Sequence, residues 1–266
     1  MSLLHDRLPC LPGFFTAAPS APLAAHVQRF WWLEGELGQV DEQMLHPDGG
    51  SGLIFNFAEP LLFNGDALAR PALLAGPQVA STRLQLPGRT NLMGVRFRPG
   101  MGALFLGVGL DELSGFQDAD APRPAIAALA EQLAGLDRRA QQARVEAHLL
   151  RCLAAPSPRR SAVQLLLARI AASEGRARLR DLLADVPLGQ RQLERRFRLE
   201  VGLTPKQFGR IQRVALVRRE LRNGEPLLAT ALACGYSDQA HLIHDFKTVV
   251  GMTPGQYQRR ARLAEQ

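Results

Sequence analysis

The sequence predicts an α+β protein with two domains. A small antiparallel β-barrel or sandwich with flanking helices comes first, and an all-α domain built from a repeated helical unit follows it. Three observations carry this prediction: short apolar segments separated by turn signals in the first hundred residues, one helical pattern that occurs twice in the last hundred, and a difference in charge between the two parts. A chain of 266 residues is long enough to bury two cores.

The N-terminal part has the pattern of β structure after an irregular, proline-rich start over residues 1–25. Asn64-Gly65 closes one apolar segment and is a strong hairpin signal. A turn at Pro47-Asp48-Gly49-Gly50 precedes another apolar segment. Several short strands at this spacing indicate a small antiparallel barrel or sandwich. The predicted strands cover residues 27–33, 52–57, 61–63, 73–74, 83–86 and 91–97.

A helical pattern replaces the β pattern after this series, over residues 101–106 and then 124–153. Near its end Val145, Leu149 and Cys152 fall at helical spacing among charged residues, which predicts an amphipathic helix. Its apolar stripe needs a partner, which is either the chain's own β-domain or a second copy of the chain. The sequence leaves both open.

Residues 154–160 have the composition of an interdomain linker, with Pro156 and Pro158. The N-terminal domain then covers residues 1–153 and the C-terminal domain residues 161–262. Residues 1–158 contain 12 basic and 15 acidic side chains, whereas residues 159–266 contain 20 basic and 10 acidic ones. A basic helical domain is typical of proteins that bind a polyanion such as DNA.

The repeated unit occupies residues 193–208 and 242–257, an offset of 49 residues with no gap, and seven of its 16 aligned positions are identical. In each copy a leucine and a phenylalanine four residues apart share one helix face, which is therefore expected to be buried. A plain helical bundle is the simpler alternative. An array of helical repeats normally needs at least three copies, so two copies argue against an array.

The residues after each repeated helix predict where it stops and where the next helix starts. Gly202 and Gly251 stand at a position that favours positive φ. Thr204-Pro205 and Thr253-Pro254 then supply an N-cap and a first helical residue. A short apolar segment and a turn precede each copy, at residues 179–189 and 227–237, so each unit has a helix-turn-helix layout.

A single long helix, from Pro205 to Arg222, is predicted between the two units. Its length is about 27 Å at a rise of ~1.5 Å per residue, close to the ~34 Å that separates successive major grooves on one face of DNA. One rigid rod could therefore hold two recognition helices at neighbouring grooves.

Residues 161–260 resemble the DNA-binding domain of the AraC/XylS family of bacterial transcription regulators. The motif that carries the resemblance runs from Ala231 to Tyr257, with the sequence ALACGYSDQAHLIHDFKTVVGMTPGQY. The segments at residues 46–56 and 94–100 resemble a cupin-like sensor or oligomerisation domain that precedes such DNA-binding domains. The resemblance implies double-stranded DNA as the partner, bound at two successive turns of the major groove. It also implies transcription regulation, with activation and repression both open.

The resemblance further implies a small-molecule effector in the N-terminal domain, and it leaves RNA polymerase and a second copy of the chain open as partners. The alternative is a non-sensing regulator whose barrel only dimerises. If Phe30, Trp32, Phe55, Phe57 and Phe97 fill the barrel interior, an effector has no room there. A cavity of a few hundred Å³ with converging polar groups would favour sensing.

The family's base-reading positions carry over by alignment on Leu193 and Leu242. They fall on Gln190, Arg191, Glu194 and Arg195 in the first unit, and on Gln239, Ala240, His241 and His244 in the second. Arginine can pair with guanine, glutamate with cytosine and glutamine with adenine, whereas alanine only touches a thymine methyl. We therefore expect the first unit to supply most base discrimination and the second to sit on phosphate, with Lys247 as one contact. Glu194 and Arg198 could instead form a surface pair.

Catalysis and metal binding have little support. His26, His46 and Asp48 lie in the predicted β-domain, but only the last two are close together, and a turn explains both. Cys10, Cys152 and Cys234 are too scattered for a zinc site or a disulfide framework. We expect no enzyme activity, no metal and no cofactor. The chain has no signal-peptide core and no apolar run of membrane-spanning length, so we expect a cytoplasmic protein that does not enter the membrane.

Overall fold

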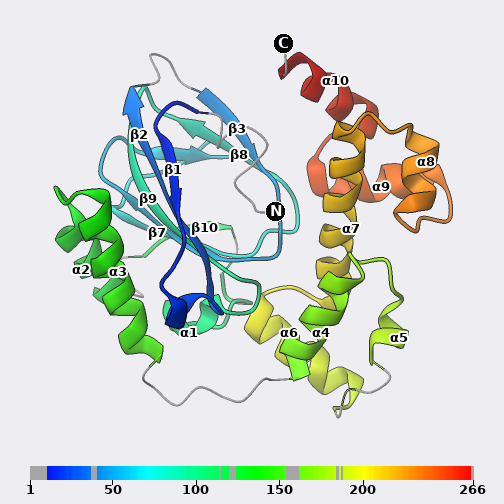
Figure 1. Ribbon diagram of the computed structural model, residues 1–266, viewed down its shortest axis with the longest axis horizontal. Coiled ribbons are helices and arrows are strands. Elements are labelled where there is room, and N and C mark those ends of the chain that lie inside the picture. Colours follow the sequence, from blue (N-terminus) through cyan, green and yellow to red (C-terminus); the bar gives the residue numbers. More distant parts are fainter. Residues whose placement is uncertain are drawn as a thin grey trace.

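The computed structural model describes residues 11–36, 41–113, 115–119, 124–153, 162–183, 186 and 188–264. A β-rich N-terminal part and a helical C-terminal part lie side by side (Figure 1), which confirms the predicted α+β class. The predicted linker at residues 154–160 and Cys10 lie outside the described residues.

Two antiparallel sheets form the N-terminal part. The larger has the strand order β1-β2-β9-β4-β7-β10 and the smaller the order β3-β8-β5-β6. The strands are β1 (Phe14–Ala17), β2 (Val27–Glu36), β3 (Asp41–Leu45), β4 (Gly52–Asn56), β5 (Leu61–Phe63), β6 (Asp66–Leu68), β7 (Ala72–Ala75), β8 (Thr82–Leu86), β9 (Arg89–Phe97) and β10 (Phe116–Asp118).

The six predicted strands are all present, with small differences at their ends, and four further strands were not predicted. The irregular structure predicted for residues 1–25 is wrong at β1, where Phe14 pairs with Leu33 and Ala17 with Phe30 of β2. A strand of four residues is too short to show a clear alternation of apolar and polar side chains in the sequence.

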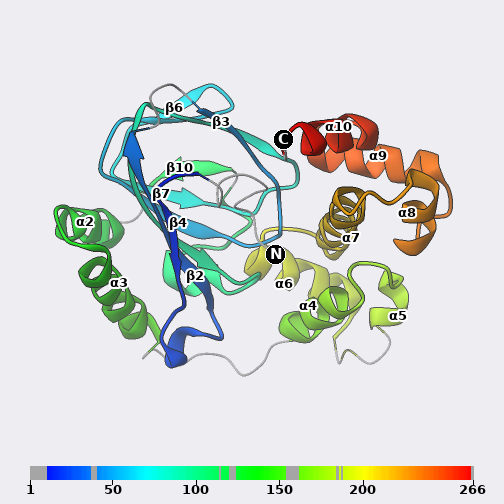
Figure 2. The same ribbon diagram turned by 45° about the horizontal axis from the view of Figure 1, so that its top comes forward.

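Strand β2 is buried on both faces, and its side chains alternate between two cores. Phe30 and Trp32 lie in a core beneath the helices, whereas Trp31 and Leu33 lie in the core between the two sheets. The helix-side core is completed by α1 (Gly102–Leu106), α2 (Pro124–Leu133) and α3 (Arg138–Leu153). In Figures 1 and 2, α2 and α3 lie on the side of the sheets away from the C-terminal helices.

The predicted amphipathic helix is α3, and its apolar stripe packs on the chain's own sheet. Val145 and Leu149 are fully buried in the helix-side core. Gln141 accepts a hydrogen bond from the Trp32 indole at 2.8 Å. The helical pattern over residues 124–153 is interrupted between α2 and α3, where Gly135 has a φ of 75°.

Seven helices make up the described C-terminal part: α4 (Ala162–Ala172), α5 (Leu179–Leu183), α6 (Gln190–Val201), α7 (Pro205–Arg222), α8 (Leu227–Ala233), α9 (Gln239–Val250) and α10 (Pro254–Ala264). They form two cores, one for each unit, and α7 belongs to both. Phe208 and Ile211 pack in the first core, and Val214 and Val217 in the second. Two helix-turn-helix units joined by one helix are therefore confirmed.

The N-terminal domain contacts both units and the helix between them. The Leu110 N–H donates to the carbonyl of Leu199, near the end of α6, at 2.8 Å. Ser81 donates its N–H and its hydroxyl to the carbonyl of Val249, near the end of α9, at 2.8 and 2.9 Å. Between these points the side-chain amide of Gln212 on α7 donates to the carbonyl of Asp48 at 3.1 Å.

Candidate nucleic-acid interface

The recognition helices α6 and α9 end as their sequences predict. Gly202 and Gly251 have φ values of 75° and 83°, and their N–H groups donate to carbonyls four residues earlier. Thr204 forms a capping box with Gln207 at the start of α7. Thr253 accepts from the Gln256 N–H at 3.3 Å at the start of α10. Each recognition helix is therefore followed by a sharp turn into a capped helix.

The predicted base-reading residues of the first unit share the outer face of α6. Gln190, Arg191 and Arg195 are exposed and Glu194 is half-buried, while Leu193 on the opposite face is buried. The Gln190 amide donates to the Glu194 carboxylate at 3.0 Å. This contact holds Glu194 along the helix surface, between the two arginines.

The predicted residues of the second unit lie on the outer face of α9. Ala240, His241, His244 and Lys247 are exposed, and Gln239 is half-buried. The predicted residues of α9 offer a methyl group, an amide, two imidazoles and one ammonium group, whereas those of α6 include two guanidinium groups.

The His241 side chain is held against its own unit. Its Nε2 lies 3.6 Å from Oδ2 of Asp245, and its ring meets the Tyr236 ring edge-on with centroids 5.2 Å apart. Its backbone N–H donates to the Asp238 carboxylate at 2.7 Å, and this bond lowers the pKa of Asp238. The backbone of His241 is therefore part of the capping turn of α9, while its side chain is exposed to solvent.

A partly buried ion pair that the sequence did not predict joins α9 to α7. Asp245 has a nearly buried side chain, and its Oδ1 lies 3.0 Å from Nε of Arg210. Arg213, one helical turn further along α7, stacks over the Tyr236 ring and donates to the carbonyl of Gly175 at 3.0 Å. An aspartate between Leu242 and Phe246 was the available signal, because a carboxylate on a buried helix face needs a partner.

A basic cleft of about 420 Å³ lies between the two units. Its lining includes Lys206 and Arg210 of α7, His241 and His244 of α9, and Arg178 from the segment before α5. Arg178, Lys206 and Arg210 were not among the predicted DNA contacts. For Lys206 and Arg210 the signal in the sequence was their four-residue spacing, which places both on one face of the linking helix.

The histidines and the aspartate weighed as metal ligands serve other contacts. His26 packs edge-on against Phe105. The Nδ1 of His46 lies 2.6 Å from the Ser81 hydroxyl, and its ring packs edge-on against Tyr257 of α10. Asp48 pairs with Arg96. Across the described ranges, no group of three or more His, Cys, Asp or Glu side chains could hold a metal ion.

Cys234 lies in the turn of the second unit and packs in its core. Burial raises the pKa of its thiol to about 11, so it remains protonated at neutral pH. Within the part of the chain that the structure describes, no helix is both long and apolar enough to cross a membrane.

Comparison with known families and proteins supports the helical part most directly. A helix-turn-helix domain family matches residues 182–260, and a domain family of unknown function (DUF6597) matches residues 16–117. The transcriptional activator RhaR of Klebsiella pneumoniae is 30% identical over 112 residues, which cover 41% of this chain and 40% of that protein. A putative AraC-like transcription regulator of Streptomyces antibioticus is 35% identical over 80 residues, covering 30% and 26%.

The chain therefore matches less than half the length of these curated relatives, which are named as regulators and not as enzymes. Among solved structures, ToxT from Vibrio cholerae aligns over 93% of this chain and 98% of its own, with a TM-score of 0.47 and 10% identity. Residues 182–260 are therefore similar to the helix-turn-helix domains of AraC-like transcription regulators.

Proposed function

We propose that this protein is a sequence-specific DNA-binding regulator of transcription. The observation that carries the proposal is the pair of exposed recognition helices fixed to one connecting helix. Helix α7 has 18 residues and contributes to both cores, so the two units cannot move apart without breaking one of them. Its length of about 27 Å suits neighbouring major grooves on one face of DNA.

The first unit is assigned most of the base discrimination. Arg191 and Arg195 are exposed on α6 and can each bond to the O6 and N7 atoms of guanine. Glu194 can accept from the amino group of cytosine, and Gln190 either reads adenine or holds Glu194 in place. These four side chains span little more than one helical turn, which suits adjacent base pairs.

The second unit is assigned mainly to positioning. Ala240 can touch a thymine methyl but donates no hydrogen bond. His244 and Lys247 are exposed on the same helix and can bond to phosphate, as can Lys206 and Arg178 at the rim of the basic cleft. Phosphate contacts fix the register of the protein on DNA, and base contacts then choose the sequence.

The test is selection of bound duplexes from a random pool with the full-length chain, followed by binding to the selected duplex at increasing salt. We expect an asymmetric site that spans two turns of DNA, with its more strongly specified half under α6. The logarithm of the affinity should fall linearly with the logarithm of salt concentration, because phosphate contacts release counterions. Recovery of no preferred sequence would contradict the proposal.

We assign the N-terminal domain the role of effector sensor, and the position of its aromatic side chains supports this. Phe30, Trp32, Phe55 and Phe97 lie in the core beneath the helices, with Phe57 packed against it, and not between the two sheets. The aromatic filling considered from the sequence is therefore on the other face of the large sheet. The space between the sheets keeps a cavity of about 50 Å³. This volume is below the few hundred Å³ that would favour sensing, so the support comes from the unfilled space alone and restricts the effector to a small molecule.

A second function for this domain, dimerisation, is favoured by the outer surface of α2 and α3. Leu136 and Leu150 are exposed there, and Ala140, Ala143 and Ala147 line a shallow groove beside them. Sedimentation equilibrium would test it by comparing the wild-type chain with Ala143→Glu. A wild-type dimer that the charge disrupts would support dimerisation, and a monomeric wild-type chain would exclude it at the concentration used.

A further inference from the structure

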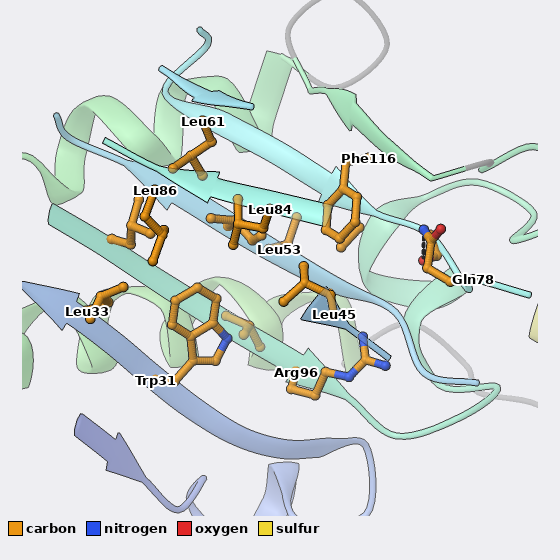
Figure 3. A pocket seen from close by; sticks show the side chains of 16 residues that line it. Trp31, Leu33, Leu45, Leu53, Leu61, Gln78, Leu84, Leu86, Arg96 and Phe116 are labelled. Atoms are coloured by element: carbon orange, nitrogen blue, oxygen red, sulfur yellow. Dashed lines mark hydrogen bonds between the residues drawn. The ribbon is translucent and has the colours of Figure 1, made fainter. Parts of the chain in front are cut away.

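The cavity between the two sheets is apolar with one charged end. Leucines and the rings of Trp31 and Phe116 form most of its wall, and Arg96 and Gln78 are the charged and amide side chains in it (Figure 3). Gln78 is already engaged, because its amide donates to the Gly76 carbonyl at 3.1 Å and accepts from Thr82 at 3.3 Å. Arg96 is therefore the group in this wall that can attract a charged ligand.

Arg96 is buried, with 4% of its surface exposed, and its hydrogen bonding is incomplete. Its guanidinium pairs with the carboxylate of Asp48, and its Nε is buried with no hydrogen-bond partner among the described residues. Burial lowers the pKa of Arg96, whereas the nearby Asp48 raises it. A buried donor without an acceptor costs free energy, so an anion that enters the cavity would satisfy a donor that the protein itself leaves unbonded.

We propose that this cavity binds a small carboxylic acid with an apolar hydrocarbon part. The hydrocarbon part lies against Trp31 and the leucines, and the carboxylate replaces that of Asp48 as the ion-pair partner of Arg96. This proposal rests on the proposed function, because it specifies the chemistry of the effector. A cavity of about 50 Å³ holds only a few water molecules, so the hydrocarbon part is short. A planar carboxylate suits a guanidinium because it can accept two parallel hydrogen bonds.

The loop that carries Asp48 connects the cavity to the helical domain. The Asp48 carbonyl accepts the amide of Gln212 on α7 at 3.1 Å. Gly49 has a φ of 82° and lies against Phe208, so closely that an added Cβ would be 2.4 Å from its ring. His46, in the same loop, contacts the Ser81 hydroxyl that holds the end of α9. When a ligand displaces Asp48, this loop loses its anchor on the sheet, and its hold on α7 loosens.

The experiment is calorimetric titration of the full-length chain with short straight, branched and aromatic carboxylates, each paired with its primary amide. We expect one or more acids to bind, and the matching amide to bind about 10- to 100-fold more weakly, the equivalent of one charge-assisted hydrogen bond. The fluorescence of Trp31 should change on binding in a Trp32→Phe variant, where it is the only tryptophan left of two. Equal binding of acid and amide, or binding of none of the acids, would overturn the proposal.

Two variants separate anion recognition from damage to the fold. Asp48→Asn removes the carboxylate that competes with the ligand for Arg96. The affinity of this variant for the acid should therefore rise, whereas a variant with a damaged fold would bind the acid more weakly. Arg96→Met combined with Asp48→Asn removes both charges and leaves no unpaired buried ion. This double variant should be folded and should lose the preference for the acid over its amide. A retained preference would show that Arg96 does not bind the carboxylate.

Hydrogen exchange tests the connection to the DNA-binding domain. The Gly50 N–H donates to the Asp48 carboxylate at 2.8 Å. The amide exchange rates of Gly50 and of residues 208–212 should increase when the acid saturates the protein. Unchanged exchange rates would show that the ligand does not displace Asp48. These titrations contain no DNA. Their failure would leave the selection of a DNA site unaffected, and failure of that selection would leave the ligand titration interpretable.

Discussion

The two helix-turn-helix units follow one sequence pattern, but they fix their recognition helices in different ways. Helix α6 begins after Gly189, which has no side chain to cap it, whereas α9 begins after Asp238, whose carboxylate caps it. At the position where α9 has Asp245, buried and paired with Arg210, α6 has the exposed Arg196. At this position the first unit exposes its charged side chain to solvent, whereas the second unit uses its charged side chain to fix α9 to α7.

Under the proposed function, this difference corresponds to a division of labour between the units. The second unit, with few base-specific groups, would set the distance and angle at which the first unit meets the next groove. The first unit would then supply the arginines that discriminate between bases. The comparison can be tested by substitutions at positions that are equivalent in the two units.

The largest effect is expected from Asp245→Ala. Its removal leaves Arg210 without its partner beside the core, and breaking a buried ion pair typically costs about 3–5 kcal/mol. We expect about 3 kcal/mol here, because Arg210 is one-third exposed. Urea unfolding of the full-length chain would measure it. The matched control is Arg196→Ala in the first unit, which should change stability by less than ~0.5 kcal/mol. Similar losses from both variants would show that the ion pair does not distinguish the units.

The next effect concerns base discrimination. Arg195→Ala should cost about 1–3 kcal/mol of binding to the selected duplex relative to a scrambled one, because a bidentate contact to guanine is lost. The equivalent residue of the second unit is His244, and His244→Ala should reduce discrimination by less. Fluorescence anisotropy with both duplexes gives the two affinities. Equal losses of discrimination would mean that both units read bases.

A smaller, sequence-independent effect is expected at Lys247. Its replacement by Ala should weaken binding to the selected and scrambled duplexes equally and should lower the slope of log affinity against log salt by about 1. Arg191→Ala serves as the comparison, because a base contact changes the ratio between the duplexes. A selective loss on the chosen sequence would place Lys247 at a base and not at phosphate.

The helical domain could be predicted nearly to the residue, because its signals are local. Gly202, Gly251 and the two Thr-Pro pairs each set a boundary through their own backbone preferences. The N-terminal domain was predicted less completely. Strand β3 forms by pairing with the distant β8, and strands of three to five residues, such as β1 and β3, show little periodicity in the sequence. The division of β2 between two cores was not predicted either, because apolar side chains on both faces hide the alternation.

The candidate site shows the same limit. The exposed face of α6 followed from the spacing of Leu193 and Phe197, since the opposite face of a helix is fixed once one face is buried. The pair of Arg210 and Asp245 joins two residues that are 35 positions apart in the sequence, and it depends on how α7 and α9 cross. That crossing is set by tertiary packing, which helical periodicity alone does not contain.

The smallest effect is expected at the caps, and it depends on pH. The cap bond lowers the pKa of Asp238 below the ordinary value of 3.8, so the ionised carboxylate stabilises the folded state. This contribution is complete above the ordinary value and is lost as the pH falls through the lower, folded value. The difference in Tm between wild type and Asp238→Ala should therefore be constant near neutral pH and shrink as the solution is acidified. Gly189→Asp introduces the same cap on α6, where an added Cβ meets nothing within 4 Å. It should raise the Tm with the same pH dependence, and a pH-independent change in either variant would show that the charge on the cap does not matter.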